Sequence, residues 1–450
     1  MRFKNGVASS VSSEFFKGLL IHLIYFFVHI KLIVKMVLNL RSNESSVSLL
    51  TDSSLFYLVV RLSRWWRSTS IPKIIVPPIP EQNDEELTTI NKIQNVHSII
   101  AACPTLHRLY YPPLIFMSSH AQLIPLFVIS WLERMFPPCT WITELAELSD
   151  GEFIHLDWAN SIIESNTVDN TPILMIHHGA NGNTRDLPGQ TYVGEALKRG
   201  WHVCVFNRRG HNKALSKANF NFFGSTSDIR QIIQKYIKDK RPLAPVFMLG
   251  NSAGSGCVAR YMGDQGLQEG AREGFCSAAV GISPGYNIEK CMGRMNPIYE
   301  KALLIGNSYY LHHNRELLQN CPSFTDCLEA SDLQSWLDSS WSLAGKSSKE
   351  EYYEHTNPMR VVEHISQPCL FINAEDDPLC VIENVEEHAP LFNTVLSRSM
   401  VAIAVSKVGG HCCFYEANAN PLKFSSWSER VSFEFFDAVL FDIRKNNIPV

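Results

Sequence analysis

The chain has 450 residues, of which 45% are hydrophobic and 19% are charged, with a formal net charge of −4. This composition excludes wholesale disorder, and the absence of a basic excess argues against a nucleic-acid-binding protein. Only one stretch approaches membrane-spanning length, which argues against a multi-span transporter. The 12 cysteines contain no CxxC pair, so neither a zinc ribbon nor a disulfide scaffold is expected, and a reducing compartment is favoured.

Residues 19–38 read LLIHLIYFFVHIKLIVKMVL, which is long and apolar enough for one membrane-spanning helix. We therefore predict an N-terminal membrane anchor over residues 1–41, either a single span or an interfacial segment. A buried helix of a soluble protein is the alternative, and release of the protein by alkaline carbonate extraction would rule out a span. The charges flanking the run do not reveal its orientation.

Residues 42–94 are predicted to be a linker with one possible interfacial helix. The segment is Ser/Asn-rich over 42–54, and then reads LFYLVVRLSRWWRS over 55–68. Arginines interspersed with apolar residues and a Trp pair suit a helix at a membrane surface. An ordinary amphipathic helix packed on the globular domain explains the same pattern, so both interpretations stay open. We place the globular domain at residues 95–450.

Short apolar runs alternate with helical stretches from about residue 140 onward. Continuous apolar runs separated by helices indicate an α/β fold with a mostly parallel central sheet and helices on both faces. The flanks of the turn Ser149–Gly151 read as a β-hairpin. The predicted strands are 172–178, 201–207, 244–250, 276–283, 368–374 and 400–406, and the clearest predicted helices are 189–199, 225–240 and the C-terminal stretch from Trp427.

Residues 288–350 break this alternation, because they are helical, aromatic and rich in Leu, with no strand signal. We predict a helical cap inserted between two strands. Such an insertion would lie over the carboxyl edge of the sheet, where open α/β sheets bind their ligands.

The run Gly250–Asn251–Ser252–Ala253–Gly254 follows a predicted strand and precedes a helical stretch. This is the GxSxG nucleophile elbow, a sharp turn that projects the serine hydroxyl above the sheet. We therefore predict Ser252 as the nucleophile of a serine hydrolase.

A second GxSxG occurs at Gly281–Ile282–Ser283–Pro284–Gly285. The amide that follows the nucleophile must donate to the oxyanion, and Pro284 has no N–H whereas Ala253 has one. The second copy is therefore interpreted as a turn at the end of a strand.

The partners of Ser252 are expected after later strands, in the order acid and then histidine. Asp377 directly follows the run 368–374 and its loop, with Asp376 as the alternative acid. His411 follows the run 400–406 and a Gly–Gly pair. We predict that His411 is the general base and that Asp377 orients and stabilises its imidazole.

The oxyanion hole is expected to combine two backbone amides. One is the N–H of Ala253, and the other lies in the loop His178–Gly179–Ala180, where lipases and esterases carry an HG motif. We predict Ala180 as the second donor and assign no proton-transfer role to His177 or His178.

These motifs together resemble the alpha/beta-hydrolase-domain family, in particular its membrane-anchored lipase and esterase branch (AB hydrolase family four). The similarity covers most of residues 95–445 and includes CPTLHRLYYPP, SSHAQ, DGEFIHLDW, HHGANGN, FNRRGHN, FFGSTSDIRQ, GNSAGSG, GISPGYN, NAEDDP and GGH. The resemblance implies an alpha/beta-hydrolase fold, hydrolysis of acylglycerol, phospholipid or similar esters, and an N-terminal membrane segment. It implies no cofactor.

The sequence thus predicts a carboxylic ester hydrolase that acts on membrane lipids, of monoacylglycerol or phospholipid type, through a Ser252–His411–Asp377 triad. It predicts no metal site, and no feature requires an obligate protein partner. A thioesterase would use the same site, and a lipid- or steroid-binding receptor on a hydrolase scaffold is the alternative of a different class.

Overall fold

A computed structural model describes residues 62–63, 65–77, 95–113, 116–123, 135–186, 191–268, 274–395, 400–417, 425–446 and 448. The predicted anchor over residues 1–41, with its apolar run 19–38, lies outside these residues. Within the described ranges, no helix combines the length and the apolarity that a membrane crossing needs. The anchor therefore stays a prediction.

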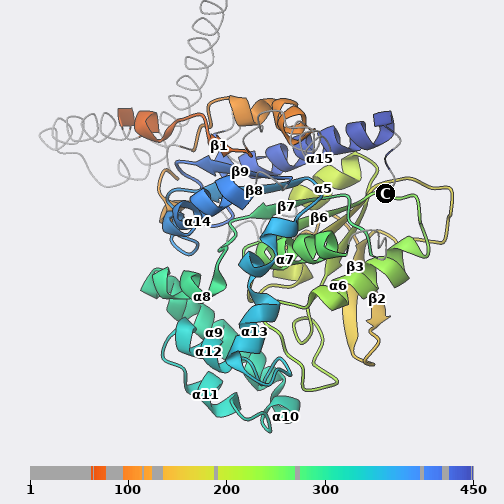
Figure 1. Ribbon diagram of the computed structural model, residues 1–450, viewed down its shortest axis with the longest axis vertical. Helices are drawn as coiled ribbons and strands as arrows, with labels where there is room; N and C mark the ends of the chain where they lie inside the picture. The colour runs from red at the N-terminus through yellow and green to blue at the C-terminus, as the bar shows by residue number, and fades with distance from the viewer. Residues whose placement is uncertain are drawn as a thin grey trace, which may run out of the picture.

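The core of the molecule is a nine-stranded sheet with the order β1-β9-β8-β7-β6-β4-β5-β3-β2 (Figure 1). The strands from β4 to β9 pair in parallel, the hairpin β2–β3 pairs antiparallel with itself and with β5, and β1 pairs antiparallel with β9. The predicted hairpin, the six predicted strands and the mostly parallel sheet are all confirmed. The strands are β1 (Lys73–Ile75), β2 (Trp141–Glu147), β3 (Phe153–Ala159), β4 (Ile173–His177), β5 (His202–Phe206), β6 (Val246–Asn251), β7 (Ala278–Ile282), β8 (Cys369–Ala374) and β9 (Val401–Ser406).

The parallel strands are apolar throughout because both faces of the sheet are covered. In β4, Leu174 and Ile176 join a core with residues of α5 (Thr191–Lys198) and α15 (Trp427–Asn446). The alternate residues Ile173 and Met175 join a second core on the other face. That face is covered by α6 (Thr226–Ile232), α7 (Ala253–Leu267) and α14 (Ile382–Val395).

One predicted helix differs from the structure in its winding. The sequence predicts a continuous helix over 225–240, whereas the α-helix ends at Ile232 and the chain continues as a π-helix over Ile233–Lys238. Ile232, Ile233 and Ile237 are all fully buried against the sheet. The wider π turn thus keeps the apolar residues on the core side, which the apolar pattern alone does not distinguish from a regular helix.

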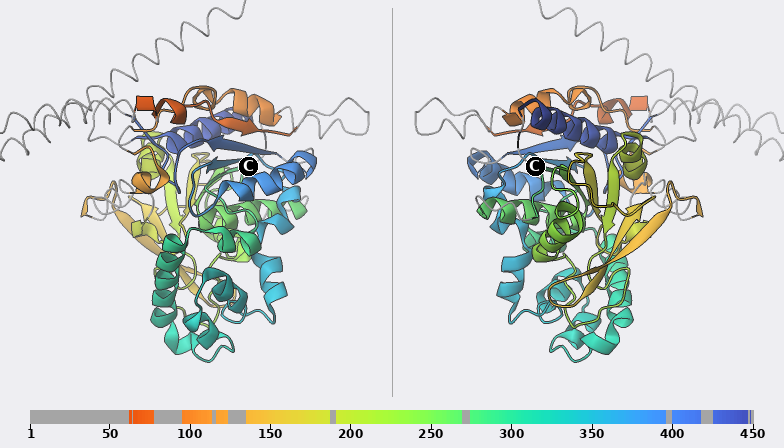
Figure 2. Two further views of the ribbon diagram at one scale, coloured as in Figure 1. Left: turned by 90° about the vertical axis from the view of Figure 1, so that its left-hand side faces the viewer. Right: turned by 90° about the vertical axis from the view of Figure 1, so that its right-hand side faces the viewer.

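Six α-helices, of 4 to 17 residues, lie between β7 and β8, where the sequence indicates an inserted cap. They gather on the side of the molecule opposite α15 (Figures 1 and 2). Polar caps define several of their starts, since the side chains of Asn296, Asp332 and Ser348 each accept a hydrogen bond from a backbone N–H of the first turn. The six are α8 (Ile288–Cys291), α9 (Pro297–His313), α10 (Arg315–Leu318), α11 (Phe324–Glu329), α12 (Leu333–Ser339) and α13 (Lys349–Thr356).

The segment predicted as a linker, 42–94, needs correction at its described end. β1 lies in this segment and extends the sheet past β9, with Ile74 opposite Ala404. Trp65 is buried, stacks on Tyr111 and donates its indole N–H to the carbonyl of Pro112 at 2.9 Å. The described part of the possible interfacial helix is thus packed on the domain. A three-residue edge strand carries too little periodic pattern to be recognised in sequence.

Candidate active site

The nucleophile elbow lies between β6 and α7. Ser252 has a positive φ of 54°, which is strained for a residue with a side chain. A Cβ at Gly250 would collide with the backbone of Gly254, and a Cβ at Gly254 would collide with the carbonyl of His177. The strand and the helix can therefore meet at Ser252 only because both flanking positions are glycine.

The structure brings together the three side chains that the sequence predicts for the triad. The Oγ atom of Ser252 lies 2.7 Å from Nε2 of His411, and Nδ1 of His411 lies 2.9 Å from Oδ2 of Asp377. The three residues follow β6, β8 and β9, whose carboxyl ends share one edge of the parallel sheet. His411 and Asp377 are both buried.

The two neighbouring acids have different contacts. Asp377 accepts hydrogen bonds from the imidazole of His411 and from the backbone amides of Leu379 and Cys380. Asp376 instead accepts from the amides of Gly409 and Gly410, at 2.9 and 3.0 Å. The geometry therefore favours Asp377 as the acid, while Asp376 holds the loop that carries the imidazole.

The second GxSxG is a turn at the end of β7. Ser283 is fully buried, and its Oγ accepts a hydrogen bond from the amide of Cys412 at 3.1 Å. Its hydroxyl thus supports the loop next to His411 and is not presented to a ligand. This placement agrees with the sequence interpretation.

The two predicted oxyanion donors lie on either side of Ser252. Ala180 and Ala253 both line the cavity that contains Ser252 and His411. A Cβ at Gly179 would lie 3.5 Å from that of Ser252, so the loop before Ala180 passes close to the nucleophile. Among the described residues, neither amide donates a hydrogen bond to a protein acceptor. Both are therefore available to a substrate oxygen.

The support of this loop is the part of the site that the sequence did not predict. Arg208 is buried, and its guanidinium donates to the carbonyls of His178, Gly179 and Ala180 at 2.7, 2.6 and 3.1 Å. The carbonyl of Gly179 and the N–H of Ala180 belong to one trans peptide and point in opposite directions. By holding this carbonyl, Arg208 fixes the direction of the predicted oxyanion donor and polarises it.

Two neutral histidines complete this support. His178 lies 2.9 Å through Nδ1 from the carbonyl of Gly179, and its Nε2 accepts from the amide of Arg208. Burial, followed by the charge of Arg208, lowers the pKa of His211 to about 3 and holds that of His178 well below its usual value. Nε2 of His211 lies 3.1 Å from the carbonyl of Ala180. Both rings are thus neutral near pH 7 and act through fixed hydrogen bonds.

Replacement of Arg208 with methionine is expected to lower kcat for ester hydrolysis by about ten- to a hundredfold, with a smaller change in KM. The reason is that a misplaced oxyanion donor weakens binding of the transition state more than that of the substrate. Steady-state kinetics, with rates divided by the concentration of active sites, measure kcat and KM of the variant.

Arg209 provides the matched control, because it is also buried but pairs with Asp228 and Asp150 instead of the oxyanion loop. Its replacement with methionine should lower the free energy of unfolding and leave kcat per folded molecule much closer to wild type. Equal losses of kcat in both variants would contradict the role assigned to Arg208.

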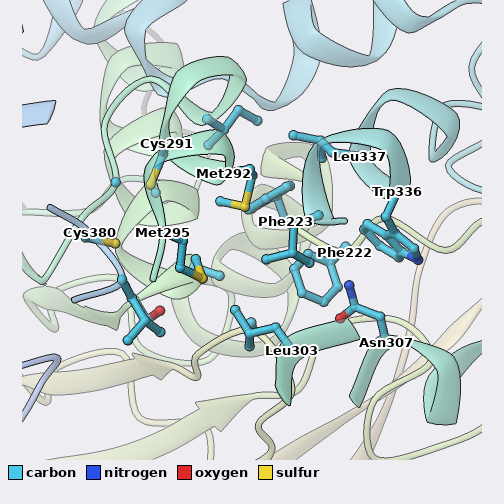
Figure 3. Close-up of a pocket in the computed structure, with 18 of the residues that line it drawn as sticks. Phe222, Phe223, Cys291, Met292, Met295, Leu303, Asn307, Trp336, Leu337 and Cys380 are labelled. Carbon is cyan, nitrogen blue, oxygen red and sulfur yellow. The ribbon is translucent and has the colours of Figure 1, made fainter. Parts of the chain in front are cut away.

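A cavity beneath the cap is lined by Ser252 and His411, and its remaining lining is drawn in part in Figure 3. Most of its wall is apolar and comes from the cap helices and from the loop before α6. Among the described residues that line it, there is no Lys or Arg. Its main apolar side chains are Phe222, Phe223, Leu303, Leu333, Trp336 and Leu337.

One group of potential metal ligands lies in the site: side-chain atoms of Asp377, Cys380 and His411 lie within 4.8 Å of one another. Both imidazole nitrogens of His411 are already engaged, with Asp377 and with Ser252. A metal ion would have to displace the first of these contacts. The donor set therefore fits the hydrogen-bonded triad better than a metal site.

Residues 172–401 match the family model described as alpha/beta hydrolase fold. The chain belongs to the alpha/beta hydrolase fold family. The match contains Ser252 and Asp377 and ends before His411. The expected fold and the alpha/beta-hydrolase family are confirmed, and the membrane-anchored branch of that family stays a prediction.

Curated relatives cover most of this alpha/beta hydrolase at low identity. Human Protein ABHD15 is 24% identical over 72% of this chain and 67% of its own length. Human Monoacylglycerol lipase ABHD2 is 25% identical over 76% of this chain and 82% of its own length. Mouse Phospholipase ABHD3 is 24% identical over 70% of this chain and 75% of its own length.

Proposed function

We propose that this alpha/beta hydrolase is a serine hydrolase that cleaves carboxyl esters of lipids through an acyl-enzyme intermediate on Ser252. The observation that carries the proposal is the continuous hydrogen-bonded chain from Ser252 through His411 to Asp377. The relatives named as a monoacylglycerol lipase and a phospholipase support a carboxylic ester hydrolase. A protein that only binds a lipid would need the cavity but would not need the hydrogen bonds that join Ser252, His411 and Asp377.

The proposed reaction has two stages. Nε2 of His411 removes the Ser252 proton as Oγ attacks the ester carbonyl, and the imidazolium is stabilised by Asp377. The amides of Ala180 and Ala253 hold the negative oxygen of the tetrahedral intermediate. His411 then gives its proton to the leaving alcohol, and in the second stage it activates a water molecule that releases the fatty acid.

The composition of the cavity favours an uncharged alcohol group over a charged one. The part of the wall that the structure describes offers apolar surface for an acyl chain but no Lys or Arg to offset a phosphate. Burial of an unpaired charge in such surroundings is costly. We therefore favour a monoacylglycerol over a phospholipid as the type of substrate, with the membrane as its source and the segment 19–38 as the proposed anchor.

The substrate assignment is tested with three decanoyl compounds presented to the purified full-length protein in detergent micelles. We expect the rate of fatty acid release to be highest for glycerol monodecanoate and much lower for decanoyl lysophosphatidylcholine. A higher rate with the phospholipid would overturn the preference for an uncharged head group. A higher rate with decanoyl-coenzyme A would favour a thioesterase.

The pH profile of kcat/KM should reflect the environment of His411. Burial by itself would lower the pKa of His411, but the adjacent Asp377 carboxylate holds that pKa well above its usual value. Because the general base must be neutral, kcat/KM should rise with increasing pH through an apparent pKa above 6.5. A profile that is flat from pH 5 to pH 9 would contradict a titrating imidazole base.

A further inference from the structure

Asn307 is a polar residue in the mostly apolar wall of the cavity. It lies on the cap helix α9 and is fully buried, and its amide points toward the ring of Phe222 (Figure 3). Both Oδ1 and Nδ2 of Asn307 have no hydrogen-bond partner among the described residues. A buried amide thus faces the cavity with its donor and its acceptor both unused.

Asn307 differs in degree from the other buried asparagines that the structure describes, because both of its amide atoms are buried without a partner, whereas Asn251 and Asn384 each have one such atom. Asn314, seven residues further along the chain, accepts from the amide of Leu215 and donates to two carbonyls. Asn373 accepts from the hydroxyl of Tyr286 and donates to the carbonyl of Pro284. Buried polar groups normally have such partners, so the amide of Asn307 calls for a ligand.

Packing alone does not explain an asparagine at this position. The neighbouring side chain of Leu303 is apolar, and a leucine would suit the same wall. Trp336 adds mostly apolar surface, although its indole N–H is also buried without a partner. An unpartnered amide lowers stability relative to an apolar residue of similar size. Sites that trade stability for an unused polar group are typical of ligand recognition.

We propose that the amide of Asn307 binds an uncharged hydroxyl group of the bound ester inside the cavity. The inference rests on the proposed function and names a feature of its substrate. An amide offers one acceptor and two donors, which complements a hydroxyl group. The described lining residues include no Lys or Arg that would pair with a charged group, so the proposed partner is uncharged.

The polar group can belong to either half of the ester. It is a free glycerol hydroxyl if the alcohol half lies along α9, and a hydroxyl on the fatty acid if the acyl chain lies there. Three substrates separate these sources: ethyl decanoate, which has no such group, glycerol monodecanoate, and ethyl hydroxydecanoate with the hydroxyl in mid-chain.

The test compares kcat/KM of wild type and Asn307→Leu on these three esters. We expect the variant to lose about ten- to a hundredfold on one hydroxyl-bearing ester relative to ethyl decanoate, because a site built for a polar group discriminates strongly. The ester that shows the loss identifies the source. A merely structural role would change all three values by the same factor, and that result would overturn the proposal.

Two further readouts keep the outcome interpretable. The midpoint of thermal unfolding of Asn307→Leu should equal or exceed that of wild type, since the variant removes an unpartnered amide. A clear decrease, together with unchanged selectivity, would assign Asn307 to the fold instead of the substrate. If the wild type hydrolyses none of the three esters, the serine hydrolase assignment itself fails, which is distinct from equal losses in the variant.

Discussion

Replacing Ser252 with alanine is expected to lower kcat for ester hydrolysis by roughly a millionfold, the loss that follows removal of the nucleophile from a triad that acts as a unit. The fold should survive, because the positive φ of Ser252 is imposed by the close packing of Gly250 and Gly254 and not by its hydroxyl. The release of decanoic acid from glycerol monodecanoate can be followed over hours, which is long enough to measure so large a decrease in kcat. Any residual rate would come from the oxyanion amides and substrate binding.

Ser283 supplies the matched control, because it has the same sequence motif and a similar positive φ of 52°. Its hydroxyl accepts from the amide of Cys412 instead of facing His411. Alanine at this position should cost about 1 kcal/mol of stability from the lost hydrogen bond and far less activity than the change at Ser252. Comparable losses of kcat in the two variants would contradict the assignment of the nucleophile.

Replacing Asp377 with asparagine is expected to lower kcat by roughly ten-thousandfold. The amide has nearly the shape of the carboxylate but would favour the imidazole tautomer with Nε2 protonated, which cannot accept the Ser252 proton. It would also leave the imidazolium without its buried countercharge. Because the carboxylate is what raises the pKa of His411 against burial, the pH at which kcat/KM rises should shift downward in this variant.

Asp376 is the natural comparison, since the sequence alone leaves both acids open. Burial raises the pKa of Asp376 to about 6, and its carboxylate accepts from the amides that precede His411. Asparagine at this position should disturb the loop and lower kcat by about tenfold, the cost of roughly one hydrogen bond. If Asp376→Asn were the more damaging of the two changes, the acid would have to be reassigned.

Much of the fold could be predicted from the sequence, because the patterns that indicate strands and helices are both local in the chain. Continuous apolar runs mark strands buried on two faces, and the helices between them carry their own periodicity. The order of Ser252, Asp377 and His411 depends only on which strand each follows. Since parallel strands bring their carboxyl ends to one edge, chain order was enough to predict that these three side chains meet.

The remaining features depend on contacts between distant segments. Arg208 lies in a polar run that looks like an ordinary surface loop, and only its burial beneath residues 178–180 reveals its role. Asn307 reads as one polar residue on a helix, and nothing nearby in sequence shows that it faces a cavity. β1 has three residues, which are too few to show a periodic pattern, and it is defined by its antiparallel pairing with β9.

The central claim is that the Ser252 hydroxyl is an activated nucleophile, and covalent labelling tests it most directly. Full-length protein is incubated with a fluorophosphonate probe at pH 8, digested and examined by mass spectrometry. We expect the phosphonyl group on the peptide that contains Ser252, no labelling of Ser252→Ala, and slow labelling of Asp377→Asn. Equal labelling of wild type and Ser252→Ala, or an adduct on another serine alone, would contradict the account.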